Sequence, residues 1–570
     1  MPPADAHRLG AAHQARLAER GSRHRTGAWY TPADVVDRLL DRVLDPLLAA
    51  RAAQGTDAVA ALRILDPACG AGAFLAAAAD RVARALVACG AAPAEAARRA
   101  RCTVVGIDLD PEAARLCRAA LAGADGDDAH APEPTVLVAD ALLLVDSGAG
   151  AMGGRSAGDE GAARLTGPGG CAPDGFDLVV GNPPFLTPLR RRSAADDARR
   201  RALADRYGRA AGAQTDAAAL FLLAGLRMAA PGGTVCMIEP LSFLSAHDAA
   251  AVRAAVLDGA ALVGLWDAQD RVFDAAVPVC APVLVRHGPP GPVALWTGRS
   301  CTPAGQAPAP PSDGAPWAPL LAPGRGVPVV DLADDGTVGD EAEVTADFRD
   351  QYYGLLGAVV DEDAPDPDAG PSRPPTGPPL VTSGAIDPAR LLWGRRTVRF
   401  GGASYRRPRV DLSRLDPTLA AWAGRRLVPK VLVATQTRVL EAVADPVGAL
   451  LPSVPVVTVA APADRVHHLG ALVIAPPVVA LATLWHAGTG LGGGSLRLAA
   501  RDVAALPRPA GRAAWDAGAA AFRAAQEAVD PDESRAHLLA CGAAMCTAFG
   551  VTDPEPLLAW WTRRLPPVRA

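Results

Sequence analysis

Short apolar runs rich in β-branched residues alternate with alanine-rich segments of helical spacing over the first 286 residues of the chain. The runs that predict strands are 62–66, 102–108, 135–140, 176–181, 233–240, 261–267 and 278–285. Helices are expected near 73–90, 111–122, 214–230 and 246–258. Strands and helices that alternate in this way predict an α/β fold with a doubly wound, mostly parallel sheet. The last two runs are close in sequence, so we expect an antiparallel hairpin that closes one edge of the sheet.

Changes in composition divide the chain into parts. From the N-terminus, the expected parts are a helical arm at 1–25, the α/β domain at 26–286, a linker at 287–378, a second α/β domain at 379–510 and C-terminal helices at 511–570. The linker is inferred from its many Pro, Gly and acidic residues. A Gly-rich segment at 147–170 predicts an insertion within the first α/β domain.

The formal net charge of −5 hides an uneven distribution of charge along the 570 residues. Residues 331–370 hold thirteen acidic residues and one arginine, whereas residues 390–438 hold twelve basic residues and two acidic ones. Four aromatic residues lie within the basic stretch: Trp393, Phe400, Tyr405 and Trp422. Basic side chains interleaved with aromatic ones favour contact with nucleic acid.

The cysteines and the apolar segments indicate in which cellular compartment the protein is expected. Ten cysteines are scattered without a CxxC pair, which argues against zinc and for a reducing environment. The N-terminus lacks the apolar core of a signal peptide. The longest apolar run, 469–485, is broken by Pro476 and Pro477 and therefore predicts buried core. We expect a cytoplasmic protein with no metal site and no membrane contact.

The segment "LRILDPACGAGAFLAAAAD" (62–80) has the pattern strand, glycine turn, helix. In a doubly wound sheet this pattern places a nucleotide-like ligand at the carboxyl end of the first strand. Asp108 and Asp140 end the next two predicted strands, and an acid at such a position can accept hydrogen bonds from ribose hydroxyls. Because the segment lacks a GxGxxG phosphate cradle, we expect a ribose-bearing ligand without phosphate.

Asn182, in "FDLVVGNPPF" (176–185), is the only asparagine of the chain. Asn and Pro are ordinary turn residues, but the other turns of this chain use Gly, Asp and Pro. The retention of one asparagine after a buried strand indicates that a neutral amide is needed at this position.

These segments resemble a known family. "DPACGAGAFL", "GIDLDP", the Asp140 segment and "NPPF" are similar to the S-adenosylmethionine-dependent amino-methyltransferases, which have a class I, Rossmann-like fold. "TGAWYTP" (26–32) narrows the resemblance to the γ-class N6-adenine DNA methyltransferases of restriction–modification type. A looser similarity of 380–510 implies a C-terminal α/β domain that recognises DNA.

The resemblance implies the cofactor S-adenosylmethionine and the residues that hold it. In that family the Thr-Pro turn and the glycine loop bind the methionine part, the second-strand acid binds the ribose and the third-strand acid meets the adenine amino group. The matching cofactor-binding positions here are Thr31, Pro32, Asp66, Ala68, Cys69, Gly70, Asp108 and Asp140.

The catalytic residues implied by the resemblance act on an adenine that has left the duplex. The side-chain oxygen of Asn182 and the carbonyl of Pro183 would accept the two amino hydrogens of N6, which favours a localised lone pair on the nitrogen. The two prolines, Pro183 and Pro184, keep the backbone rigid. Phe185 would stack on one face of the adenine, and Phe273 matches the family position that stacks on the other.

Two arginine-rich regions are the expected DNA contacts. The region after the "NPPF" motif carries Arg190, Arg191, Arg192, Arg199, Arg200 and Arg201. In the basic stretch we expect DNA contacts from Arg395, Arg396, Arg406, Arg407 and Lys430, the only lysine of the chain.

The expected function is site-specific methylation of N6 of adenine in duplex DNA, for restriction–modification or phage defence. A separately encoded restriction nuclease or defence proteins are the expected partners, since Val428 occupies the position where a fused PD-ExK nuclease has an acid. Two alternatives stay open: N5-glutamine methylation of protein or amino-methylation of RNA, and a catalytically silent DNA-binding subunit of a defence complex.

Overall fold

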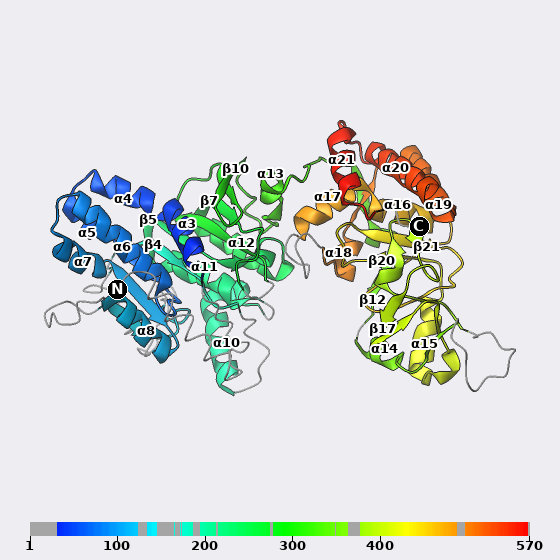
Figure 1. Cartoon of the computed structure of the whole chain (residues 1–570), viewed down its shortest axis with the longest axis horizontal. Coiled ribbons are helices and arrows are strands. Elements are labelled where there is room, and N and C mark those ends of the chain that lie inside the picture. Colours follow the sequence, from blue (N-terminus) through cyan, green and yellow to red (C-terminus); the bar gives the residue numbers. More distant parts are fainter. Residues whose placement is uncertain are drawn as a thin grey trace. The chain divides into compact units, whose positions relative to one another are not determined.

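The chain forms two compact units, Met1–Gly324 and Arg325–Ala570, in a computed structural model (Figure 1). The structure describes residues 31–122, 134–144, 165, 172, 174–185, 194–212, 215–273, 277–347, 349–362, 377–486 and 496–567. The expected helical arm at 1–25 and most of the Gly-rich insertion at 147–170 lie outside these residues.

The first unit is built on a ten-stranded sheet with the order β10-β9-β7-β8-β5-β4-β1-β2-β3, in which β6 pairs with β8. Its strands are β1 (Ile64–Asp66), β2 (Val104–Asp108), β3 (Thr135–Val138), β4 (Phe176–Gly181), β5 (Ala229–Met237), β6 (Glu239–Pro240), β7 (Ala260–Asp267), β8 (Val279–Arg286), β9 (Val293–Thr297) and β10 (Thr302–Ala307). The five strands β5, β4, β1, β2 and β3 are mutually parallel. The predicted doubly wound α/β fold is confirmed.

Helices cover both faces of this sheet. They are α3 (Ala33–Val43), α4 (Asp45–Ala52), α5 (Thr56–Ala60), α6 (Ala73–Ala88), α7 (Pro93–Arg101), α8 (Pro111–Ala122), α10 (Ala194–Tyr207), α11 (Ala217–Met228), α12 (Ala250–Gly259) and α13 (Ala322–Arg325). Val180 of β4 packs into the core cluster formed with α3 and α6. Its neighbour Val179 faces Gly225 of α11, as expected for side chains that alternate between the faces of a strand.

The predicted hairpin and linker need correction. β7 and β8 pair in antiparallel fashion as predicted, but β9 and β10 continue the sheet beyond β7, so the hairpin does not close the edge. Much of the segment 287–378 is folded rather than a linker. Its first part supplies β9 and β10, and its later part supplies strands that pair within the second unit.

The second unit has a four-stranded sheet with the order β12-β23-β20-β21 and several two-stranded pairings. The four strands are β12 (Glu343–Ala346), β23 (Val457–Ala460), β20 (Lys430–Ala434) and β21 (Glu441–Asp445). The paired short strands are β11 (Asp334–Thr337) with β24 (Pro507–Pro509), β13 (Val359–Asp361) with β19 (Pro408–Val410), β14 (Leu380–Val381) with β22 (Leu451–Pro452), β15 (Ile386–Asp387) with β16 (Arg390–Leu391), and β17 (Val398–Phe400) with β18 (Ala403–Tyr405).

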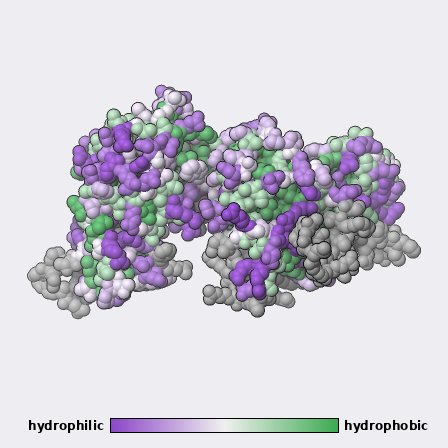
Figure 2. All heavy atoms as spheres, turned by 180° about the vertical axis from the view of Figure 1, so that it is seen from behind, coloured by the Kyte–Doolittle hydropathy of each residue, from purple (hydrophilic) through white to green (hydrophobic). Residues whose placement is uncertain are grey.

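Helices pack around these strands. They are α14 (Arg349–Gly354), α15 (Pro417–Arg426), α16 (Val466–Ile474), α17 (Pro476–Trp485), α18 (Ala500–Ala504), α19 (Arg512–Glu527), α20 (Pro531–Ala548) and α21 (Pro554–Arg564). The apolar run 469–485 forms most of α16 and α17, and the side chains of both helices are mostly buried, as predicted. Within the described ranges, no single helix has the length and apolar character to cross a membrane; α16 and α17 qualify only together, with a bend of 57°. On the face that Figure 2 shows, hydrophilic and hydrophobic residues are interspersed.

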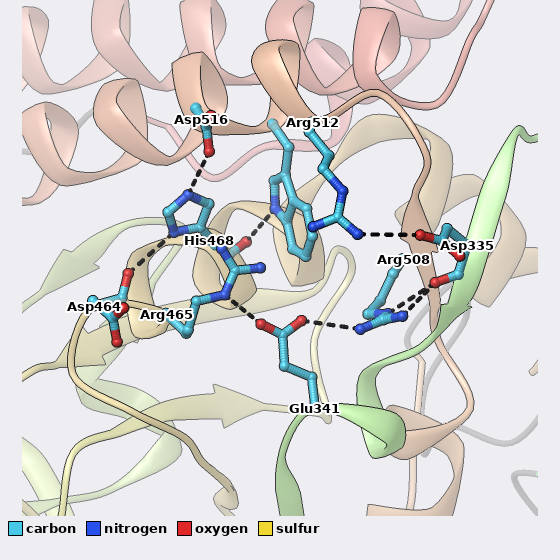
Figure 3. Close-up of polar contacts among 9 residues, drawn as sticks. Asp335, Glu341, Asp464, Arg465, His468, Arg508, Arg512 and Asp516 are labelled. Carbon is cyan, nitrogen blue, oxygen red and sulfur yellow. Dashed lines mark hydrogen bonds and ion pairs between the residues drawn. The ribbon is translucent and has the colours of Figure 1, made fainter.

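An ion-pair network joins part of segment 287–378, which was predicted to be a linker, to other elements of the second unit (Figure 3). Glu341 pairs with Arg465, the N-cap residue of α16, and with Arg508 of β24. Burial acts to raise the pKa of Glu341, but hydrogen bonds and charge from Arg465 and Arg508 outweigh it and lower that pKa. Arg465 also stacks over Trp515, 4.7 Å from the ring centroid. These residues line a cavity of about 310 Å³.

Candidate active site

The carboxyl ends of four parallel strands meet at one edge of the first sheet, where a ligand of a doubly wound fold binds. Asp66 ends β1, Asp108 ends β2, Asp140 follows β3 and Asn182 follows β4. The strand order β4-β1-β2-β3 makes these four positions neighbours across the edge. The structure therefore brings together the four polar residues that the sequence singled out.

The glycine loop after β1 is fixed by hydrogen bonds from its own backbone. The Ala68 N–H donates to Asp66 Oδ1 (3.0 Å), the Cys69 N–H to the Ile107 carbonyl (2.9 Å) and the Gly70 N–H to Asp108 Oδ2 (2.8 Å). Gly70 has φ +52°, and a Cβ placed on it would meet no atom within 4 Å. The loop thus presents bare backbone to open space, which allows close approach of a ligand.

Asp66 is buried where β4 passes β1. A Cβ added to Gly181 would lie 2.5 Å from Asp66 Oδ1, so only glycine allows this approach. Burial raises the pKa of Asp66 to about 8, with a further contribution from the nearby charge of Asp108, while the hydrogen bond from Ala68 acts in the opposite direction. Near neutral pH this carboxyl group is therefore largely protonated and can donate a hydrogen bond.

Asn182 is held by a residue 151 positions earlier in the chain. Its Nδ2 donates to Oγ1 of Thr31 over 3.0 Å, and Thr31 is only 5% exposed. Thr31 is itself placed by the next residue, Pro32, whose carbonyl accepts from Val35 and Val36 at the start of α3. Because the amide nitrogen faces Thr31, the amide oxygen of Asn182 is turned toward the opposite side.

Pro183 is buried and Pro184 half-buried, and the motif ends at Phe185. The ring of Phe185 contacts the ring of Phe273 edge to face, with centroids 6.0 Å apart and planes at 72°. Both rings pack against the core cluster of α3 and α6. The predicted pair is thus brought together, but the rings must separate before a base can lie between them.

Asp140 has a partner that the sequence did not predict. Its Oδ1 accepts from the Leu142 N–H (3.2 Å), and its Oδ2 accepts from Nε of Arg199 (2.7 Å). We expected Arg199 to contact DNA phosphates. Nothing in the local sequence indicates that α10 crosses to this acid. Arg190, Arg191 and Arg192, from the same arginine-rich region, lie outside the described residues.

Glu239 is a second buried acid that the sequence analysis missed. It follows Ile238, whose N–H donates to the carbonyl of Gly181 (3.0 Å). Its side chain is fully buried, and within the described part of the chain its two oxygens have no hydrogen-bond partner. Burial, with help from Asp216, raises the pKa of Glu239 well above its usual value. Its burial therefore disfavours the charged form of this side chain.

The predicted DNA-binding residues of the second unit have different environments. Arg395, Arg406 and Arg407 are exposed. Arg407 also lies over the ring of Trp393, with its guanidinium carbon 5.5 Å from the centroid. Arg396 is turned toward Asp387, to which it donates two hydrogen bonds of 2.9 and 3.0 Å. Three of the five predicted residues are therefore accessible to solvent, and their contact with DNA stays a prediction.

For Lys430 the prediction of DNA binding was wrong. Its side chain is 0% exposed, and its Nζ lies 2.6 Å from Asp445 Oδ2. The two residues face each other in the register of β20 and β21. Burial lowers the pKa of Lys430, partly offset by Asp445. A count of basic residues could not distinguish this buried strand position from the exposed arginines around it.

In the ranges that the structure describes, no group of three or more His, Cys, Asp or Glu side chains could hold a metal ion. The site consists of a glycine loop, three acids at strand ends and one anchored amide.

The first unit has the doubly wound, Rossmann-like fold of the class I methyltransferases, and the second unit follows it as a C-terminal domain. Residues 15–293 match the family model described as N-6 DNA Methylase. No curated protein matches the chain.

Two solved structures have a similar fold over most of the chain. One is the Type IIL restriction-modification enzyme MmeI in complex with DNA, with a TM-score of 0.60 and 12% identity, covering 94% of this chain and 78% of that one. The other is a DrdV–DNA complex, with a TM-score of 0.51 and 15% identity, covering 91% of this chain and 59% of that one. At these identities the similarity establishes the fold.

Proposed function

We propose that this protein transfers a methyl group from S-adenosylmethionine to N6 of an adenine that has been flipped out of duplex DNA. The observation that carries the proposal is the anchored amide: Asn182 donates to Thr31 and stands at the strand edge beside the glycine loop. The match of residues 15–293 to the model of N-6 DNA methylases supports the same chemistry.

The residues of the loop fit S-adenosylmethionine. Gly70 has a positive φ with open space beside it, where a side chain would otherwise stand. Thr31, Pro32, Asp66, Ala68, Cys69 and Gly70 would hold the methionine part. Asp108 would bind the ribose hydroxyls, and Asp140 would accept from the adenine amino group. When bound, the cofactor supplies an electrophilic methyl group on a sulfonium.

Asn182 and Pro183 would increase the nucleophilicity of N6. The amide oxygen of Asn182 and the carbonyl of Pro183 each accept one amino hydrogen, which localises the nitrogen lone pair. The bond to Thr31 fixes which end of the amide faces the base, and Pro184 restrains the backbone. Acceptors fixed in advance need no reorganisation during the reaction. Separation of Phe185 from Phe273 would provide aromatic faces for the flipped base.

Recognition of DNA is assigned to the second unit, whose exposed arginines include Arg395, Arg406 and Arg407. The solved MmeI structure of similar fold contains DNA, which supports this assignment. We further propose that the protein serves restriction–modification or phage defence in the cytoplasm, together with a separately encoded nuclease or defence proteins.

Transfer of a tritiated methyl group tests the function directly. Purified protein is incubated with labelled S-adenosylmethionine and either duplex DNA, RNA or a protein extract, and labelled DNA is digested to nucleosides. We expect label in N6-methyl-2′-deoxyadenosine from DNA. Label confined to RNA or to glutamine in protein would show an amino-methyltransferase with another substrate. No transfer to any of the three, by a protein that binds DNA, would show a silent subunit.

A further inference from the structure

Arg199 makes a polar contact that reaches outside its own helix. Its Nε donates to Oδ2 of Asp140 over 2.7 Å, with the Asp140 side chain 15% exposed and that of Arg199 35% exposed. The Leu142 N–H donates to the other oxygen, Oδ1. Both carboxylate oxygens therefore have a fixed donor, and the rotation of the carboxylate plane is restricted.

The helix that carries Arg199 is attached to the same segment at further points. The Tyr207 hydroxyl donates to the Leu142 carbonyl over 2.9 Å, and Arg206 donates to the Leu143 carbonyl. Tyr207 is buried and has Arg227 of α11 over its ring, 4.7 Å from the centroid. The last turns of α10 are thus tied to the residues after Asp140, and Arg199 is presented from a supported element.

We propose that Arg199 is a positioning residue for the adenine of S-adenosylmethionine, acting through Asp140. The proposal rests on the cofactor site assigned above. A carboxylate oxygen can accept two hydrogen bonds, so Oδ2 can receive both Arg199 and the cofactor's amino group. With the plane of the carboxylate fixed, an amino group is favoured over a carbonyl at that position of the purine, because a carbonyl oxygen would face a carboxylate oxygen.

The neighbouring Arg200 provides a matched control. It lies on the same helix, is 51% exposed at its side chain, and pairs with Asp197 one turn away. It has the same charge and the same helix propensity as Arg199 but makes no contact with Asp140. A change in ligand affinity that follows replacement of Arg199 but not of Arg200 therefore results from loss of the contact with Asp140, since both replacements remove the same charge from α10.

The test measures affinity for two ligands by calorimetry, using the full chain without DNA. One ligand is S-adenosyl-L-homocysteine; the other is S-inosyl-L-homocysteine, in which a carbonyl replaces the adenine amino group. For Arg199→Ala we expect affinity for the adenine ligand to fall about three- to tenfold, the scale of one ordinary hydrogen bond, because Arg199 acts indirectly through Asp140; little change is expected for the inosine ligand. Arg199→Lys should recover part of the loss, and Arg200→Ala should match the unchanged protein.

A purely structural role for Arg199 predicts that both ligands weaken by the same factor, in step with a lower melting temperature, and that result would overturn the proposal. The proposal would also be overturned if Arg199→Ala and Arg199→Lys both kept the unchanged protein's ratio of affinities for the adenine ligand and the inosine ligand. If the unchanged protein binds neither ligand, the cofactor site itself is wrong, which separates failure of the proposed function from failure of this inference.

Discussion

The only lysine of the chain shows how little a residue type reveals about its environment. Lys430 stands in a run of basic residues, yet its ammonium group is buried against Asp445, which also accepts from the N–H groups of Ala449 and Leu450. An ammonium group is a compact point charge, whereas a guanidinium is a wide planar fork. The buried position between β20 and β21 therefore accounts for a lysine in a chain that otherwise uses arginine.

Replacing Lys430 tests this account. Lys430→Met leaves the carboxylate of Asp445 without its buried partner, so we expect the free energy of unfolding to fall by about 3–5 kcal/mol. Chemical denaturation measures it. Lys430→Arg should also destabilise the protein while keeping the charge, because the larger side chain overpacks the position. Weakened DNA binding by a stable, folded Lys430→Met protein would revive the original prediction of a DNA contact.

Asp66 gives the stability a defined dependence on pH. Its folded-state pKa is raised to about 8, so the folded protein holds a proton that the unfolded chain releases at much lower pH. This contribution is fully present below the ordinary pKa of an aspartate and is lost as pH rises toward about 8. Asp66→Asn should flatten the dependence of unfolding free energy on pH between about pH 5 and about pH 8. Equal slopes for the two proteins would contradict the assignment.

At the scale of elements, the local pattern of apolar residues was sufficient to predict most strands of the first sheet, but it was insufficient to predict the strands of the second unit. The strands β1 to β8 come from apolar runs with clear boundaries, which fix strand positions before any tertiary contact is known. Strands β11 to β13 are at most four residues long, and they pair with β24, β23 and β19, which lie far away in sequence. The contacts Asn182–Thr31 and Asp140–Arg199 join residues 151 and 59 positions apart, and neither was predicted from the sequence.

The ion-pair network around Glu341 joins elements that are far apart in sequence, and removing the charge of Glu341 alone should weaken it. Glu341→Gln removes the charge that pairs with Arg465 and Arg508, and we expect the second unit to lose about 2 kcal/mol of stability, the scale of hydrogen bonds to charged groups. Asp516→Asn is the control, because Asp516 is 72% exposed and pairs with His468 at the surface. Limited proteolysis and thermal melting should separate the two variants. Equal stability of both would mean that the network contributes little.

At the scale of the whole molecule, two units divide the work between cofactor chemistry and recognition of DNA in the proposed function. Replacing Arg395 and Arg406 with Ala should weaken binding about equally for all DNA sequences, and should reduce the slope of log affinity against log salt by about one per lost phosphate contact. Arg563→Ala, an exposed arginine of α21 outside the basic stretch, serves as the control. Fluorescence anisotropy at several salt concentrations gives both quantities. An unchanged slope in the double variant would place the DNA surface elsewhere.

The central claim is that the Asn182 amide takes part in methyl transfer and is more than a turn residue. Asn182→Ala removes one acceptor and leaves the sheet and the glycine loop in place. We therefore expect single-turnover methylation of duplex DNA to fall by a factor on the order of 10²–10³, the scale for one preorganised polar contact. Affinities for S-adenosylmethionine and DNA should stay close to normal, and Asn182→Asp should retain more activity than Asn182→Ala. Full single-turnover activity in an Asn182→Ala protein with an unchanged melting temperature would contradict the account.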